Sequence, residues 1–314
     1  MARRTYRKEL ADLGHGLHAW LQPDGSWGYS NAGLVTDGSA SLLVDTLFDL
    51  PLTREMLDAM AAATPAARRI DVLVNTHANG DHCYGNQLVP DARIIASKAS
   101  AEEMIHVHPA MMAAMIRNAD QLGAAGAYFA RIFGAFEFEG IDPTPPNQTF
   151  EGHHELRVGN KRVELIEVGP AHTRGDVLIH VPDEGVVFTG DILFIDGTPI
   201  MWEGPVRNWI AACDRIVEMA PSVIVPGHGP LTDLAGVRGV RDYLVYVRDE
   251  ARRRYDAGLS AADAARDIAL GDYSSWLDAE RIVVNVHTLY REFGSATEPP
   301  DLVTLFGLMA ELAR

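Results

Sequence analysis

The chain has 314 residues, of which 47% are hydrophobic and 22% are charged, and these values are typical of a globular protein with a substantial core. Its formal net charge of −16 disfavours polyanionic partners such as nucleic acid. Two cysteines are too few for a disulfide framework, and no stretch has the apolar length of a signal peptide or a membrane span, so we expect a cytoplasmic protein without a membrane partner.

The first elements expected along the chain are short strands and one helix. Runs of apolar residues predict the strands, and turn residues such as Asp37-Gly38 separate them. Thr53 stands where a helix would have its N-cap. The expected ranges are strands at 18–21, 33–36, 41–44, 70–75 and 93–96, and a helix at 53–63.

A helical, methionine-rich stretch then interrupts the alternation of strands and helices. Helical periodicity extends from Ser100 to Ile116, and residues 117–147 are broken by several glycines and by Pro145-Pro146. We therefore expect a helical insertion at about 100–147 between two halves of the fold.

The second half begins at Phe150 with a hairpin that turns at Val158-Gly159-Asn160. After residue 245 the pattern becomes helical throughout, and Ser260 is expected to cap one of the helices. The sequence thus predicts a core domain at 1–245 and a C-terminal helical extension at 246–314 that packs on it. The remaining expected ranges are a strand at 162–168 and helices at 208–219, 233–256, 278–293 and 301–313.

The most informative run is Thr76-His77-Ala78-Asn79-Gly80-Asp81-His82, which follows the buried strand expected at 70–75. Three metal-capable side chains leave one strand-to-loop turn within six residues. Burying imidazoles and a carboxylate this closely is costly unless a divalent cation compensates them. The run resembles the metal signature of the metallo-β-lactamase fold, usually His-x-His-x-Asp-His, with Asn79 in place of the second histidine.

The resemblance implies an α/β protein, an αββα sandwich of the metallo-β-lactamase type, with two metal positions. It assigns His77, Asn79 and His172 to the first position. It assigns Asp81, His82 and His228 to the second, with Asp191 as the bridging ligand. Asp45 stands where this fold often has a carboxylate beneath the site, which holds the other nitrogen of a ligand imidazole.

Asn79 makes the first position weak, because a neutral amide oxygen binds zinc much less well than an imidazole nitrogen does. Asn79 either coordinates weakly or only holds a water, and an ordinary turn-stabilising role beside Gly80 is equally open. We expect one tightly bound Zn²⁺ and a weaker second ion, and iron and manganese remain alternatives. Asp81 and Asp191 are the candidate catalytic groups, which would orient a water and carry its proton.

The chemistry expected is metal-dependent hydrolysis of an ester, thioester, lactone or amide-type bond in a small, apolar or aromatic substrate. An alternative is a mononuclear iron oxidoreductase of the persulfide dioxygenase type, for which His77, His172 and Asp191 would suffice. A binding protein without catalysis is the third interpretation. The tail helices would either close the pocket or form a homodimer surface. Candidate pocket residues, for which an ordinary core role is equally open, are Trp27, Tyr29, Met111, Met112, Met201 and Trp202.

Overall fold

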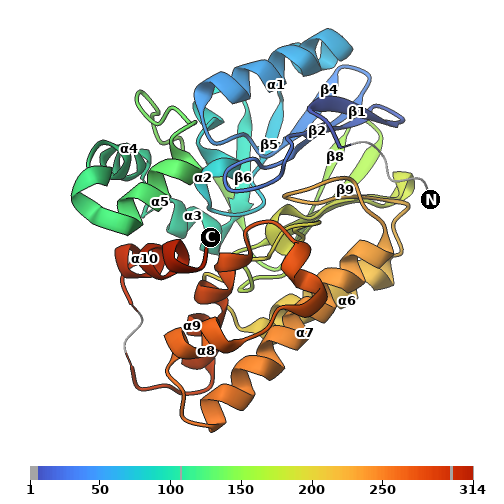
Figure 1. Cartoon of the computed structure of the whole chain (residues 1–314). Helices are drawn as coiled ribbons and strands as arrows, with labels where there is room; N and C mark the ends of the chain where they lie inside the picture. Colours follow the sequence, from blue (N-terminus) through green and yellow to red (C-terminus); the bar gives the residue numbers. More distant parts are fainter. Residues whose placement is uncertain (1–5, 107, 298–299, 314) are drawn as a thin grey trace.

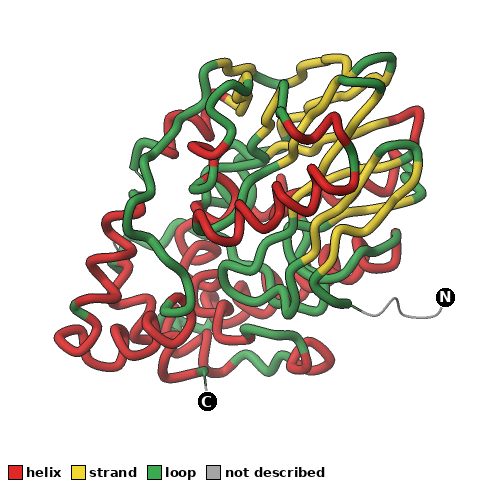
Figure 2. Tube along the Cα trace, turned by 90° about the horizontal axis from the view of Figure 1, so that it is seen from above, coloured by secondary structure: helices red, strands yellow, loops and turns green. Residues whose placement is uncertain are grey.

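The computed structural model describes residues 6–106, 108–297 and 300–313. Two β-sheets pack face to face, and helices cover their outer faces (Figure 1). This mixed α/β architecture is the fold class that the sequence predicted. In Figure 2 most of the strands lie towards one side of the molecule, and most of the helices lie towards the other.

The first sheet contains seven strands in chain order, with β1 to β4 antiparallel and β4 to β7 parallel. Along the chain, α1 connects β4 to β5, α2 lies between β5 and β6, and the insertion helices α3 to α5 connect β6 to β7. The strands are β1 Glu9–Gly14, β2 Leu17–Leu21, β3 Ala32–Asp37, β4 Ala40–Val44, β5 Val72–Val74, β6 Arg93–Ser97 and β7 Gln148–Phe150. The helices are α1 Leu50–Ala63, α2 Gly80–Cys83, α3 Lys98–Met104, α4 Pro109–Arg117 and α5 Gly123–Phe133.

The second sheet has the order β12-β11-β10-β9-β8, and only its β11–β12 pair is parallel among the strands described. Long helices follow its last strands. The strands are β8 His153–Val158, β9 Lys161–Glu167, β10 Val177–Val181, β11 Val186–Phe188 and β12 Val223–Val225. The helices are α6 Val206–Met219, α7 Leu234–Asp256, α8 Ala261–Asp267, α9 Ile282–Glu292 and α10 Leu302–Leu312.

Alternation along the strands produces separate apolar layers. On β4, Leu42 and Val44 face the second sheet and join the core between the sheets, while Leu43 faces α1. Gly33 on β3 is required by the close approach of the sheets, because a Cβ there would lie 2.2 Å from the ring of Phe188. Helices α6, α7 and α9 bury the outer face of the second sheet in a third apolar cluster.

Two helix predictions were wrong in detail. The helix expected at 100–116 is two helices: α3 ends at Met104, and α4 begins at Pro109, whose fixed φ and missing N–H suit the first turn of a helix but not its interior. Helix α1 begins at Leu50 rather than Thr53, and its N-cap is Asp49, whose side chain accepts a hydrogen bond from Leu52 N at 2.8 Å. Thr53 lies inside the helix, fully buried.

The C-terminal helices pack against the rest of the chain. Ser260 caps α8 through a hydrogen bond from Asp263 N at 3.1 Å. Helix α9 packs on α7 and α8, and α10 lies beside α5 of the insertion (Figure 1). Insertion and tail therefore meet on one side of the molecule. Within the described residues, no helix combines the length and the apolar character needed to cross a bilayer.

Candidate metal centre

The six metal ligands expected from the sequence follow strands whose carboxyl ends share one edge of the sandwich. Strand β5 runs parallel to β4 and leads to His77. Strand β11 runs parallel to β12, and these two strands lead to Asp191 and His228. Strand β9 points the same way, since two antiparallel pairings connect it to β11, and it leads to His172. The strand directions alone bring these loops together.

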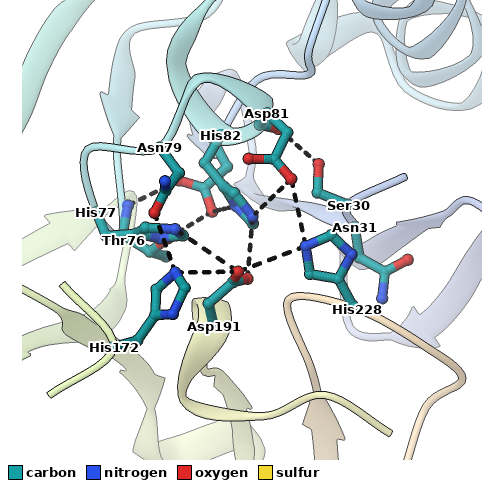
Figure 3. Close-up of polar contacts among 12 residues, drawn as sticks. Ser30, Asn31, Thr76, His77, Asn79, Asp81, His82, His172, Asp191 and His228 are labelled. Atoms are coloured by element: carbon teal, nitrogen blue, oxygen red, sulfur yellow. Dashed lines mark hydrogen bonds and ion pairs between the residues drawn. The ribbon is translucent and has the colours of Figure 1, made fainter. Parts of the chain in front are cut away.

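Asp191 lies at the centre of the cluster (Figure 3). Its Oδ2 atom is 3.4 Å from Nε2 of His172, 3.4 Å from Nε2 of His228 and 3.8 Å from Nε2 of His77. Its Oδ1 atom is 3.0 Å from Nε2 of His82. One carboxylate thus contacts all four imidazoles, which is the position a bridging ligand requires.

The second set of expected ligands is closely assembled. Asp81 Oδ2 is 3.3 Å from Nε2 of His228 and 3.9 Å from Nε2 of His82. The three ligand atoms lie within 4.8 Å of one another. That spacing suits the first coordination shell of a single divalent ion.

The first set contains two imidazoles and Asn79. Asn79 Oδ1 is 3.0 Å from Nε2 of His172, whose Nδ1 donates to the carbonyl of Ile200 at 2.6 Å. Because the Nδ1 proton is committed to a carbonyl, Nε2 presents a lone pair to the amide oxygen. Two electron-rich atoms in such contact are stabilised when a cation lies between them.

Each ligand imidazole has its Nδ1 atom held from behind, so that Nε2 points into the cluster. The acceptor is the carbonyl of Gly25 for His228, at 3.1 Å, and Asp45 Oδ2 for His82, at 2.9 Å. For His77 it is the hydroxyl of Thr76 at 3.0 Å. That hydroxyl in turn donates to Asp45 Oδ2 at 2.7 Å. Asp45 thus supports two of the imidazoles, as expected for a carboxylate beneath a metal site.

Carboxylates and imidazoles lie close together in this buried cluster and shift one another's pKa values. Burial alone would lower the pKa of His82, but the carboxylates of Asp191, Asp81 and Asp45 outweigh it and raise that pKa well above its usual value. Against burial, Asp191 and Asp81 also raise the pKa of His228 to about 9. Burial and the neighbouring His82 lower the pKa of His77 well below its usual value. The field of the carboxylates therefore attracts positive charge, which a proton or a metal ion can supply.

Several buried polar atoms in the cluster lack hydrogen-bond partners. Among the described residues, His77 Nε2, His82 Nε2 and Asp191 Oδ1 take part in no hydrogen bond. Buried polar atoms without hydrogen bonds are costly, and the ligand atoms of His77, His82 and Asp191 lie within 4.8 Å of one another. The residues present therefore fit a bound divalent cation.

A cavity of about 310 Å³ opens beside the cluster. Of the pocket residues expected from the sequence, Trp27, Met111, Met112 and Trp202 line it. Tyr29 and Met201 are not among its lining residues. Tyr29 packs on Phe136 with ring centroids 4.9 Å apart. Met201 is 1% exposed and belongs to an apolar core cluster, and its backbone N–H donates to Asn285 Oδ1 at 2.7 Å.

Sequence reasoning missed the rest of the cavity wall. Phe129 and Phe133 come from α5, Phe306 comes from α10, and Arg281 precedes α9. The glycines of 117–147 concealed α5, and the helix expected at 301–313 did not by itself indicate which surface it packs against. Nothing in the sequence indicated that Arg281 is buried, since an arginine at the start of a helix is ordinarily exposed.

Residues 25–228 match the family model described as the metallo-beta-lactamase superfamily. The human acyl-coenzyme A thioesterase MBLAC2 is 25% identical over 231 residues, which cover 69% of this chain and 79% of that protein. A hydroxyacylglutathione hydrolase of Brucella ovis is 25% identical over 190 residues, which cover 59% of this chain and 58% of that protein.

Solved structures share the fold. The sec-alkylsulfatase Pisa1 from a Pseudomonas species superposes with a TM-score of 0.66 at 16% identity and covers 92% of this chain. This chain spans about half of that enzyme, 51% of its length. A metallo-beta-lactamase from Pontibacter korlensis superposes with a TM-score of 0.56 at 18% identity over 76% of this chain and 99% of the other.

Proposed function

Because this chain belongs to the metallo-beta-lactamase superfamily, we propose that it is a metal-dependent hydrolase of a thioester or a related ester bond. The observation that supports this proposal best is the convergence of four imidazole Nε2 atoms and two carboxylates at the edge of a cavity. The names of the relatives, an acyl-coenzyme A thioesterase and a hydroxyacylglutathione hydrolase, favour a thioester as the scissile bond.

The ligand set proposed is the one that the resemblance implied, with Asp191 shared between two positions. Asp81, His82 and His228 would hold the tighter ion, since all three are strong ligands. His77 and His172 would hold a weaker ion, with Asn79 as a poor third ligand. A zinc-type cation held by these residues would lower the pKa of a coordinated water and polarise the substrate carbonyl.

The carboxylates would handle the protons of the reaction. Burial raises the pKa of Asp191, but the imidazoles of His228, His82 and His77 lower it well below the usual value, so Asp191 is ionised at neutral pH. Asp81 is more accessible, with a side chain 14% exposed against 4% for Asp191. Asp81 is therefore the better placed group to accept the proton of the attacking water and to deliver it to the leaving group.

The test combines metal analysis with a substrate screen. Protein purified without added metal is analysed for zinc, iron and manganese, and is then assayed on thioesters, lactones and a β-lactam. We expect zinc and thioester cleavage. Asp81→Ala and His228→Ala should abolish activity more completely than His77→Ala does. A zinc-loaded protein that cleaves none of these substrates would overturn the proposal.

Asn79 favours a second candidate, an iron oxidoreductase of the persulfide dioxygenase type. One iron held by His77, His172 and Asp191 needs no imidazole at position 79. The contact of 3.3 Å between Asp81 and His228 would then have no evident use, which is why hydrolysis is preferred. Native iron, oxygen uptake with a persulfide substrate, and full activity of His228→Ala would together favour this candidate.

A further inference from the structure

The cavity beside the metal centre has two chemically distinct sides. One side carries the candidate ligands His172, Asp191 and His228, and the other is aromatic. Its volume of about 310 Å³ is at the small end of the range for small-molecule sites, about 300–1,000 Å³. The aromatic side consists of Trp27, Phe48, Tyr84, Phe129, Phe133 and Phe306.

Phe306 of α10 is among the most deeply buried residues of this aromatic side. Its ring is 2% exposed, and its centroid lies 5.2 Å from that of Phe129 and 6.1 Å from that of Trp27. The lining residue Met111 is by contrast 42% exposed, so the mouth of the cavity, where it opens to solvent, is near Met111. A group that enters beside Met111 and extends away from solvent would therefore meet the ring of Phe306.

The charged residues of the lining offer no spare cation to such a group. Apart from the candidate ligand histidines, Arg281 is the one cationic residue among the described lining residues, and it is 2% exposed. Its guanidinium pairs with Asp278 at 2.8 Å, donates to the Thr198 carbonyl at 3.0 Å and stacks 4.2 Å from the ring centroid of Trp27. Because Asp278 already compensates this charge, an anionic substituent would be buried without a partner.

We propose that this cavity binds the acyl part of the substrate as an uncharged, apolar chain or ring, and that Phe306 limits its length. The inference rests on the proposed function and goes beyond it by naming the acyl class and the residue that selects it. Helix α10 of the tail is thereby part of the substrate site. The leaving group would point towards the mouth, near Met111 and Trp202.

The test uses N-acetylcysteamine thioesters, which share one small leaving group. Hexanoyl and adipoyl thioesters form a matched pair, because they have equal length and differ in a terminal carboxylate. We expect kcat/KM to be at least about 100-fold lower for adipoyl, since its charge has no partner in the cavity. Phe306→Ala should raise kcat/KM for decanoyl at least about tenfold relative to hexanoyl, in line with the effect of added methylenes in an apolar pocket.

Val303→Ala is the control for α10, because Val303 is 39% exposed and is not a lining residue. It should leave the length preference unchanged. If Phe306→Ala does not fold, Phe306→Leu should shift the preference in the same direction by a smaller factor. Equal rates on hexanoyl and adipoyl, or an unchanged length preference in a folded Phe306 variant, would overturn the inference.

Binding of octanamide, a neutral analogue of a product, separates this inference from the proposed function. Titration calorimetry on the zinc-loaded protein detects it without turnover. Octanamide binding that Phe306→Ala alters, with no thioester cleaved, would uphold the acyl site and reject the hydrolase. Thioester cleavage without octanamide binding or length preference would uphold the hydrolase and reject the acyl site.

Discussion

The carboxylate of Asp45 lies directly behind His82, with Oδ2 at 2.9 Å from Nδ1 of that imidazole. Its other oxygen accepts from Thr76 N at 2.7 Å. Asp45 has φ 61°, a conformation that asparagine also tolerates. Asp45→Asn should therefore keep the backbone while presenting an N–H₂ group to His82. The imidazole would then carry its proton on Nε2 and lose its inward lone pair.

We expect Asp45→Asn to weaken metal binding by about 10- to 100-fold, the usual cost of losing a carboxylate behind a ligand imidazole. Competition with a fluorescent zinc chelator measures this. Asp233→Asn is a suitable control, because Asp233 caps α7 on the surface and asparagine caps equally well. An unchanged affinity in Asp45→Asn would mean that the carboxylate does not set the orientation of His82.

Asn79→His should raise the zinc content towards two ions per chain under limiting zinc, because imidazole replaces a weak amide oxygen. Asn79 Oδ1 is already 3.0 Å from Nε2 of His172, so the new ring would enter the first position. Plasma emission spectrometry after gel filtration measures the content. Asn79→Ala, which removes the oxygen, should lower it. Equal zinc content in both variants and in the native protein would argue against any ligand role for position 79.

Gly227 lies against the central carboxylate, where a Cβ would be 2.0 Å from Asp191 Oδ1. Its backbone N–H donates to the Gly190 carbonyl at 2.8 Å, so the loop has little freedom to retreat. We expect Gly227→Ala to displace Asp191, abolish tight zinc binding and cost about 1–3 kcal/mol of stability. Isothermal calorimetry and urea unfolding test this.

The control for Gly227→Ala is Gly239→Ala, because a Cβ at that position in α7 would meet nothing within 4 Å. This change should stabilise the helix by up to about 1 kcal/mol and leave zinc binding intact. If Gly227→Ala binds zinc normally, the loops that carry Gly227 and Asp191 have more room to separate than these distances imply.

Much of the metal centre could be predicted because its ligands are local to strand ends. An apolar run followed by His77, or by Asp191, indicates a loop at the carboxyl end of a strand without knowledge of distant contacts. The cavity wall could not be predicted in this way. The ring centroids of Phe133 and Phe306 lie 6.2 Å apart only because α10 packs on α5. The apolar stripe of a helix does not specify which other helix it packs against. The break between α3 and α4 was likewise not predicted, because helical periodicity continues across it although Pro109 begins a new helix.

The methionines of the insertion separate into two environments. Met112 is 9% exposed and Met111 is 42% exposed, although both line the cavity. We expect Met112→Asp to destabilise the protein by about 3 kcal/mol, because it buries an unpaired carboxylate. Met111→Asp should leave the melting temperature nearly native and raise KM. Differential scanning fluorimetry and steady-state kinetics compare the two variants. An equal loss of stability in both would contradict the argument from the difference in burial.

The carboxylate of Asp176, which is 2% exposed, accepts hydrogen bonds from Thr173 N at 3.0 Å and Thr173 Oγ1 at 2.7 Å. Burial outweighs these bonds and raises the pKa of Asp176 to about 7. The unfolded chain, with a pKa of about 3.9, has released this proton by pH 5, whereas the folded protein retains it. The contribution of Asp176 to stability therefore falls as the pH rises from about 4 to 7 and is constant above that range.

Asp176→Asn cannot ionise, so its stability relative to the native protein should rise by about 2–4 kcal/mol between pH 5 and pH 8. Urea unfolding of the metal-free proteins at both pH values measures the difference, with Asp142→Asn as the exposed control. A difference in stability that does not change with pH would show that Asp176 is ionised throughout this range.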